Sequence, residues 1–289
     1  MLRSLLLAAL VALFLVVGCR TSEPKVGGVI PERLYARVAS LSPNTTELLA
    51  LLNAERVLVG RTASCDSPVT IRAVPIVANP KPDIEKMLER QVELVIADKN
   101  LLSDESAEKI KAAGIEVLRL EFNSIQDWID NVVLLGDMFL KQKVASEKVD
   151  AVLRSQSLAK SQPLSPVPKV LVAMGGNQPW AAGVESFQAD IVRAAGGEPV
   201  GPPGVNYSRV GPEQVLQWNP DVIFVSDDPN AYTLASWKGT NAGKRGLIIE
   251  VNPNLLLRAG ARVADLIGGL HTELRKIVYH EDSKVESKS

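Results

Sequence analysis

Cysteine and histidine are scarce in this sequence of 289 residues, which contains two of each. The histidines, His271 and His280, lie close to the C-terminus. Zinc and manganese sites need several histidine, cysteine or carboxylate ligands around one ion. Since the segments that would line a cleft contain no histidine, the sequence predicts no metal site formed by the protein alone.

Signature motifs of common enzymes are also absent. The chain has no HExxH, CxxC, GxSxG or GxxxxGK[ST] sequence. Ser186, in "GVES", lacks the glycine that flanks the serine of a nucleophile elbow. We therefore expect a protein that is not an enzyme. An envelope hydrolase that pairs Ser186 with His271 is the alternative, because such groups are assembled in space.

The chain has no excess of charge of either sign, because 32 basic and 33 acidic residues give a net charge of −1. A nucleic-acid partner is therefore not predicted, since binding to phosphate backbones needs a basic surface. About 270 residues remain beyond the N-terminal segment described next, which is comfortable for two lobes.

The N-terminus has the pattern of a bacterial export signal. An uninterrupted apolar run from Leu5 to Val17 follows Arg3, and it is shorter than the roughly 20 residues that span a bilayer. The run ends in "VVGC", which resembles the lipoprotein box, in which the cysteine is acylated and becomes the first residue. An ordinary signal peptide with an incidental cysteine is the alternative.

We accordingly predict a lipoprotein signal peptide over residues 1–18 and a lipidated N-terminus with a polar spacer over residues 19–36, with the lipid on Cys19. Cys65 then has no disulfide partner, so hydrophobic burial must hold the exported fold together. The expected location is the extracytoplasmic face of the cell envelope.

Strand-like and helix-like segments alternate in two parts of the chain, which predicts an α/β fold with mostly parallel sheets flanked by helices. We assign residues 37–123 to an N-terminal lobe and residues 169–280 to a C-terminal lobe. The charged residues 281–289 are expected to form a disordered tail. The expected strands are 37–41, 56–59, 74–77, 94–97, 116–120, 169–174, 222–226 and 247–251, and the expected helices include 45–53, 84–90, 106–113 and 186–195.

The alternation stops after residue 123, where one helical pattern begins. Apolar residues recur at helical spacing from Ile125 to Phe139, and "SQPLSPVP" ends the pattern after residue 160. We predict one long helix over residues 124–160, roughly 50 Å in length, that bridges the lobes. Two shorter helices with a kink at Gly136 are the alternative, since glycine weakens a helix interior by about 1 kcal/mol.

Each half also contains a similar helix–strand unit. "EKMLERQVELVIA" begins at Glu85 and "EQVLQWNPDVIFV" begins at Glu213, with a leucine three residues after the glutamate and an apolar strand at its end. Chance similarity of two such units is the alternative to an internal duplication. Their places in the two halves favour two lobes of common origin.

These stretches, with "RVASLSPNTTELLALL", "AAGIEVLRL" and "GVESFQADIVRAAGGEPV", resemble the periplasmic substrate-binding proteins of ABC importers for cobalamin, ferric siderophores and haem. The resemblance covers about residues 37–275 and is strongest to the cobalamin-binding members. It implies a monomer, without a resident cofactor, that captures a metal chelate and delivers it to a permease dimer in the membrane.

The turn "SLSPNTTELL" over residues 40–49 lies between a strand and a helix, where phosphate-binding loops occur in nucleotide-binding folds. It contains no glycine, and Asn44 with Glu47 three residues later matches a capping box. We therefore predict that the turn holds its own helix and binds no phosphate.

A ligand is expected at the carboxyl ends of the strands, where the loops of doubly wound lobes meet. Trp180 and Tyr207 are predicted to stack on a flat macrocycle, and Arg209 and Arg258 to hold anionic groups. The stretches "NQPWAAG", "NYSRV" and "NPNLLLR" coincide, by the resemblance, with pocket segments of the family. The full set of predicted ligand contacts is Asp66, Asn79, Lys81, Lys99, Asn177, Trp180, Tyr207, Arg209, Asn254 and Arg258.

The ligand itself stays open between three classes. Cobalamin binders of the resembled family surround the corrin with several aromatic residues, whereas "RTASCDSP" and "IADKNLL" offer none from the first lobe. A ferric siderophore or haem is therefore the alternative to cobalamin. The resemblance also implies that Glu85 and Glu213 dock onto the two permease subunits, while the plain alternative is that each carboxylate stabilises a helix N-terminus.

Overall fold

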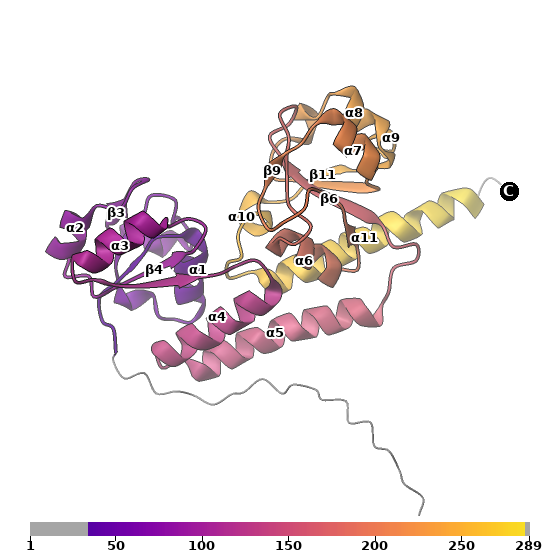
Figure 1. Cartoon of the computed structure of the whole chain (residues 1–289). Helices are drawn as coiled ribbons and strands as arrows, with labels where there is room; N and C mark the ends of the chain where they lie inside the picture. The colour runs from indigo at the N-terminus through magenta and orange to yellow at the C-terminus, as the bar shows by residue number, and fades with distance from the viewer. Residues whose placement is uncertain (1–33, 287–289) are drawn as a thin grey trace, which may run out of the picture.

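The computed structural model describes residues 34–286 and shows two α/β lobes connected by helices (Figure 1). The expected signal peptide, Cys19 and most of the expected spacer lie outside the described residues. Among the described residues, no helix is both long enough and apolar enough to cross a membrane.

The N-terminal lobe is a five-stranded sheet in the order β3-β2-β1-β4-β5, and all of its strand pairs are parallel. Every residue of β4 is buried, as expected for a strand with helices on both faces of its sheet. The expected strands and helices are all present, with their ends moved by at most three residues. The elements are β1 (Val38–Ser40), α1 (Pro43–Leu51), η1 (Glu55–Val57), β2 (Leu58–Thr62), η2 (Val69–Ala73), β3 (Ile76–Ala78), α2 (Ile84–Glu89), β4 (Leu94–Asp98), α3 (Asp104–Ala112) and β5 (Glu116–Leu120).

The C-terminal lobe contains a six-stranded sheet in which β11-β10-β6-β7-β9 are neighbours and β8 also pairs with β6. Its β6, β8, β10 and β11 are parallel, whereas the short β7 runs antiparallel to both β6 and β9. The elements are β6 (Lys169–Met174), β7 (Trp180–Ala181), α6 (Phe187–Ala194), β8 (Glu198–Pro199), β9 (Ser208–Arg209), α7 (Pro212–Trp218), β10 (Val222–Val225), η3 (Pro229–Ala231), α8 (Ala235–Gly239), α9 (Asn241–Arg245), β11 (Ile248–Glu250), α10 (Pro253–Leu256) and α11 (Val263–Glu286).

The two repeat units occupy equivalent places in the two sheets. In the first lobe α2 leads to β4, which lies between the first strand β1 and the outer strand β5. In the second lobe α7 leads to β10, which lies between the first strand β6 and the outer strand β11. The shared topology supports the interpretation of "EKMLERQVELVIA" and "EQVLQWNPDVIFV" as related units.

The prediction of one bridging helix over residues 124–160 is wrong, because the segment forms two helices, α4 (Ile125–Met138) and α5 (Gln142–Ser161). Leu140 has a left-handed φ of 55°, which ends α4, and α5 then runs back beside it (Figure 1). Gly136 is not the break itself. A Cβ on Gly136 would lie 2.6 Å from the Cβ of Ala145, so the glycine allows the two helices to approach closely.

The C-terminus also departs from expectation. Helix α11 continues to Glu286, so the backbone of residues 281–286 is helical where we predicted a disordered tail. Helix α11 packs along α5, and the two lie side by side under the second lobe in Figure 1.

One hydrophobic core extends through both lobes. It includes Leu48 of α1, Trp128 of α4, Phe224 of β10 and Ile267 of α11, each buried almost completely. Trp128 also donates a hydrogen bond from Nε1 to the carbonyl of Gly260, at 2.8 Å. The helices between the lobes therefore belong to the same packed interior as the two sheets.

Candidate functional site

In the turn after β1, the residue that caps the helix is not the predicted one. Helix α1 begins at Pro43, and the side chain of Ser42 accepts a hydrogen bond from the Thr45 amide. Asn44 instead donates to the carboxylate of Asp98 at 2.8 Å, which ties the turn to the end of β4. The predicted capping box of Asn44 with Glu47 is therefore wrong, because the helix starts before both residues.

Glu47 reaches across to the second lobe instead of back to its own helix. Its side chain is 2 % exposed, and it accepts hydrogen bonds from Arg258 Nη1 at 3.3 Å and from the Ala261 amide at 3.1 Å. Its Oε2 also lies 3.7 Å from a guanidinium nitrogen of Arg262. A Cβ on Gly260 would lie 2.1 Å from the same oxygen, so this approach requires glycine at residue 260.

Arg258 is shared between two carboxylates of the first lobe. Its Nη1 donates to Asp66 at 2.8 Å as well as to Glu47, and the hydrogen bond from Arg258 lowers the pKa of Asp66. Asp66 lies in the connection after β2 and Arg258 in the connection between α10 and α11, so the contact joins the two lobes. We call Glu47, Asp66, Arg258 and Arg262 the inter-lobe bridge.

Two predicted ligand residues pair on β7 and β9 of the second lobe, and a third, Tyr207, directly precedes β9. Trp180 pairs with Arg209 across the two antiparallel strands, and its side chain is 45 % exposed. Tyr207 precedes β9 and packs against the shared core, with its hydroxyl buried and without a hydrogen-bond partner in the described structure. Burial raises the pKa of Tyr207, so the phenol stays protonated at neutral pH. We call Trp180, Tyr207 and Arg209 the aromatic face.

The loop between β6 and β7 is held by a carboxylate that follows β10, the strand beside β6 in the sheet. Gly175 and Gly176 have left-handed φ values of 91° and 56°, which other residues adopt at a cost. The Gly175 amide donates to Asp227 at 2.7 Å, and Asp227 also accepts from the hydroxyl of Tyr232 at 2.6 Å. Asn177 extends this network, because its side-chain amide donates to the hydroxyl of Thr233 at 2.7 Å.

The remaining predicted ligand residues lie on elements other than β7 and β9. Asn79 and Lys81 are exposed on the connection from β3 to α2, and the Asn79 amide donates to the Lys81 carbonyl. Lys99 forms an ion pair with Glu121 at the end of β5. Asn254 lies in α10, where its carbonyl accepts a hydrogen bond from Arg262.

The alternative of a serine hydrolase finds no support in the geometry. Ser186 caps α6 by accepting from the Ala189 amide. His271 is buried in α11, and its Nδ1 is bonded to the carbonyl of Ala195 at 2.9 Å. Among the described residues, no group of three or more metal-ligating side chains is placed to hold an ion. Cys65 is buried and free, and it accepts a hydrogen bond from Thr46.

Sequence reasoning missed Glu47, Asp227 and Tyr232 as residues that organise the site. Two signals pointed to part of it: two consecutive glycines follow β6, and "DDPN" follows β10. Both mark tight loops at the carboxyl ends of neighbouring strands. The pairing of Glu47 with Arg258 joins residues 211 positions apart, and no local pattern in the sequence indicates it.

Comparison with known proteins adds three findings. The profile of the family described as periplasmic binding protein matches residues 38–252. An uncharacterized ABC transporter substrate-binding lipoprotein of Bacillus subtilis, YvrC, is 23 % identical over 259 residues, which cover 86 % of this chain and 81 % of that protein. A vitamin B12-binding protein of Photorhabdus laumondii is 24 % identical over 238 residues, covering 80 % and 86 % of the two chains.

Among solved structures, the periplasmic haem-binding protein RhuT from Roseiflexus sp. RS-1 superposes with a TM-score of 0.73 and 20 % sequence identity. The superposition covers 84 % of this chain and 98 % of that one. At this identity the likeness concerns the fold, and it agrees with the two α/β lobes described above.

Proposed function

The chain belongs to the periplasmic binding protein family, and from this we propose that it is the lipid-anchored receptor of an ABC importer that captures cobalamin or a related metal chelate. Membership makes the chain a transport component and not an enzyme, and the named relatives include a substrate-binding lipoprotein and a vitamin B12-binding protein. The chelate is cargo in this proposal, and the protein needs no resident cofactor.

The aromatic face is the observation that carries the choice of ligand class. A half-exposed Trp180 beside Arg209 offers an apolar ring surface for a macrocycle and a cation for a peripheral carboxylate or phosphate. In the described structure Arg209 has no carboxylate partner, whereas Arg258 is already bonded to Glu47 and Asp66. Arg209 is therefore the cation that we propose contacts the ligand.

A ligand screen tests this proposal. Thermal shifts are measured with cobalamin, haem and several ferric siderophores, and binding at a hundredfold excess over the dissociation constant is expected to stabilise the fold by about 2.7 kcal/mol. Trp180→Ala and Arg209→Ala should reduce the shift, while Arg154→Ala, at an exposed arginine of α5, should not. If no chelate produces a shift, or both aromatic-face variants bind normally, the proposed site is wrong. A haem or siderophore shift without a cobalamin shift identifies the alternative ligand.

We also propose that Glu85 and Glu213 dock the receptor onto its permease. Each is exposed at the second position of its helix, Glu85 in α2 after the Asp83 cap and Glu213 in α7 after Pro212. In Figure 1 both helices lie on the side of the molecule away from α5. Two carboxylates at equivalent places of the two lobes suit a partner that is itself a dimer.

The lipid anchor on Cys19 is part of the proposal, and its residue lies outside the described structure. The name of the Bacillus subtilis relative, a lipoprotein, supports it. Cys19→Ser should release the mature protein from membranes or stop its processing. Membrane partitioning that does not change in Cys19→Ser would mean that lipid on this cysteine is not the anchor.

A further inference from the structure

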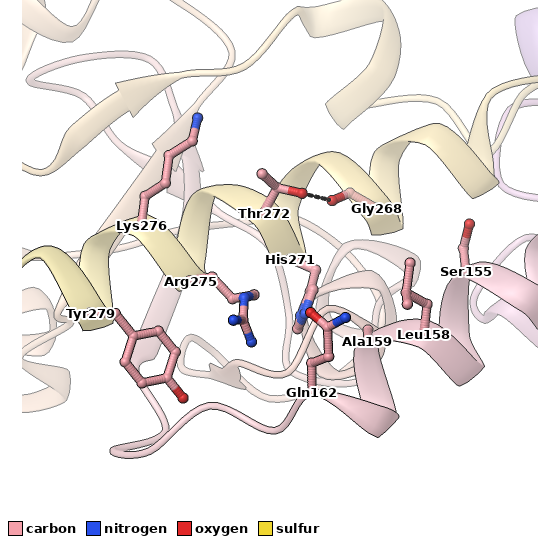
Figure 2. Close-up of a pocket in the computed structure, with 10 residues that line it drawn as sticks. All are labelled: Ser155, Leu158, Ala159, Gln162, Gly268, His271, Thr272, Arg275, Lys276 and Tyr279. Atoms are coloured by element: carbon pink, nitrogen blue, oxygen red, sulfur yellow. Dashed lines mark hydrogen bonds between the residues drawn. The ribbon is translucent and has the colours of Figure 1, made fainter.

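A groove lies between α5 and α11, and the aromatic face is carried by other elements. It has a volume of about 380 Å³ and is open to solvent. In Figure 2 His271, Arg275 and Tyr279 extend from α11 toward the end of α5, whereas Lys276 extends from the opposite side of α11. Its lining residues are Ser155, Leu158, Ala159, Gln162, Gly268, His271, Thr272, Arg275, Lys276 and Tyr279.

The floor of this groove contains a buried hydrogen-bonding atom without a partner. His271 is 4 % exposed, and its Nδ1 lies 2.9 Å from the Ala195 carbonyl. Because a carbonyl only accepts, Nδ1 carries a proton, so Nε2 is an acceptor whenever the ring is neutral. In the described structure Nε2 is bonded to nothing, although a buried polar atom normally has a partner. An occupant that donates an O–H or N–H would satisfy it.

The wall of the groove carries one cation, Arg275, without a carboxylate partner among the described residues. Arg275 is half-buried and forms no ion pair in the part of the chain described, and its guanidinium carbon lies 5.2 Å from the centre of the Tyr279 ring. Lys276 pairs with Glu273 at 3.2 Å, but both side chains are exposed, and such pairs are weak. Arg275 is therefore the cation that can serve an anionic occupant.

Apolar surface and a movable side chain complete the groove. Leu158 is 57 % exposed and Tyr279 is 40 % exposed, which favours an occupant with a carbon skeleton over a bare inorganic anion. In Figure 2 the carboxamide of Gln162 overlaps the His271 imidazole in the view drawn. This exposed side chain forms no hydrogen bond in the described structure, so it can rotate without the loss of one.

We propose that the groove between α5 and α11 binds a small hydroxycarboxylate. Its hydroxyl donates to Nε2 of His271, and a carboxylate is held by Arg275. A carboxylate matches the planar guanidinium of Arg275 by paired hydrogen bonds. The hydroxyl is the distinguishing group, because a site with a buried acceptor rejects an analogue that lacks the donor.

Malate and succinate test the proposal, since they differ only in the hydroxyl. Calorimetric titration of the full-length protein near neutral pH should show malate binding and succinate binding about tenfold weaker. Equal affinities, or no binding of malate, would overturn the proposal. Trp180→Ala should leave malate binding unchanged, which separates this groove from the aromatic face.

Variants of the groove provide the second arm of the experiment. His271→Asn can keep a donor to the Ala195 carbonyl while it removes Nε2, so malate affinity should fall to that of succinate. Arg275→Met should weaken both acids about tenfold, while Lys143→Met, at an exposed cation elsewhere on α5, should weaken neither. If His271→Asn fails to fold, Arg275→Met still decides, because unchanged malate binding in that variant contradicts the site.

Discussion

At the scale of single residues, Glu47 joins the lobes through three groups of the second lobe. It is almost completely buried, and its partners are Arg258, the Ala261 amide and Arg262. Charge-assisted hydrogen bonds in such surroundings are stronger than those on the surface, because water competes less for the same groups. The side chain therefore contributes to the stability of the whole fold rather than to α1 alone.

Removing this carboxylate should destabilise the protein. For Glu47→Ala we expect the free energy of unfolding to fall by about 2 kcal/mol, because the Ala261 amide and part of Arg258 lose their acceptor. Gly260→Ala should act through the same contact, since its Cβ would occupy the place of the Glu47 carboxylate. Urea unfolding measures both variants. The double variant should be no less stable than the worse single variant, and additive losses would contradict a shared cause.

The stability contributed by the inter-lobe bridge should also depend on pH, through Asp66. Arg258 lowers the pKa of Asp66 in the folded state below that of the unfolded chain. Its contribution to stability is therefore present above the ordinary carboxyl range, about pH 4, and is lost as the pH falls through the lowered pKa. Urea unfolding between neutral and strongly acidic pH should show a smaller loss of stability in Asp66→Asn than in the unsubstituted protein. Asp150→Asn, at an exposed carboxylate of α5, is the control, and an identical change in both variants would contradict the prediction.

At the scale of elements, the strands and helices of the lobes could be predicted from the sequence because their signals are local. The apolar strand at residues 94–98 and the pattern of Ile84–Glu89 depend only on neighbouring residues. The break between α4 and α5 was missed because "MFLKQK" contains neither proline nor glycine, and leucine, the residue with the left-handed φ, rarely adopts that conformation. The site was predicted in part: Trp180 and Arg209 pair as neighbours, whereas the partners of Arg258 come from the other lobe.

Replacement of glycine by alanine should change the free energy of unfolding in opposite directions at two helical positions. Gly136→Ala places a Cβ 2.6 Å from that of Ala145, so α4 and α5 must separate, and we expect a loss of about 1–3 kcal/mol in the free energy of unfolding. Gly269→Ala in α11 meets no atom within 4 Å, and its better helix propensity should add about 0.5–1 kcal/mol. Thermal and urea unfolding of the two variants make the comparison. A gain in Gly136→Ala would show that the glycine is not needed for helix contact.

At the scale of the whole molecule, the proposed permease contact separates ligand binding from transport. Glu85→Arg combined with Glu213→Arg should leave chelate affinity unchanged, because both residues are exposed at helix starts and neither belongs to the aromatic face. Uptake by a reconstituted transporter should be lost, since reversed charges repel a complementary surface. Lys238→Glu on α8, at an exposed site of the second lobe, is the control for charge reversal. Uptake that survives the double reversal would return both glutamates to the role of stabilising helix N-termini.

The hydrophobic core that runs from α1 through α4 to β10 and α11 has a consequence for how the protein melts. A receptor with two independent lobes would show two heat-absorption peaks, one for each lobe. Here the face of each sheet that packs on this shared core cannot lose its packing without exposing side chains of the other lobe, so we expect the lobes to form one cooperative unit. Calorimetry should show a single transition whose van 't Hoff and calorimetric enthalpies agree. For the same reason, a fragment that ends before α4 would keep all five strands of its sheet and still fail to fold.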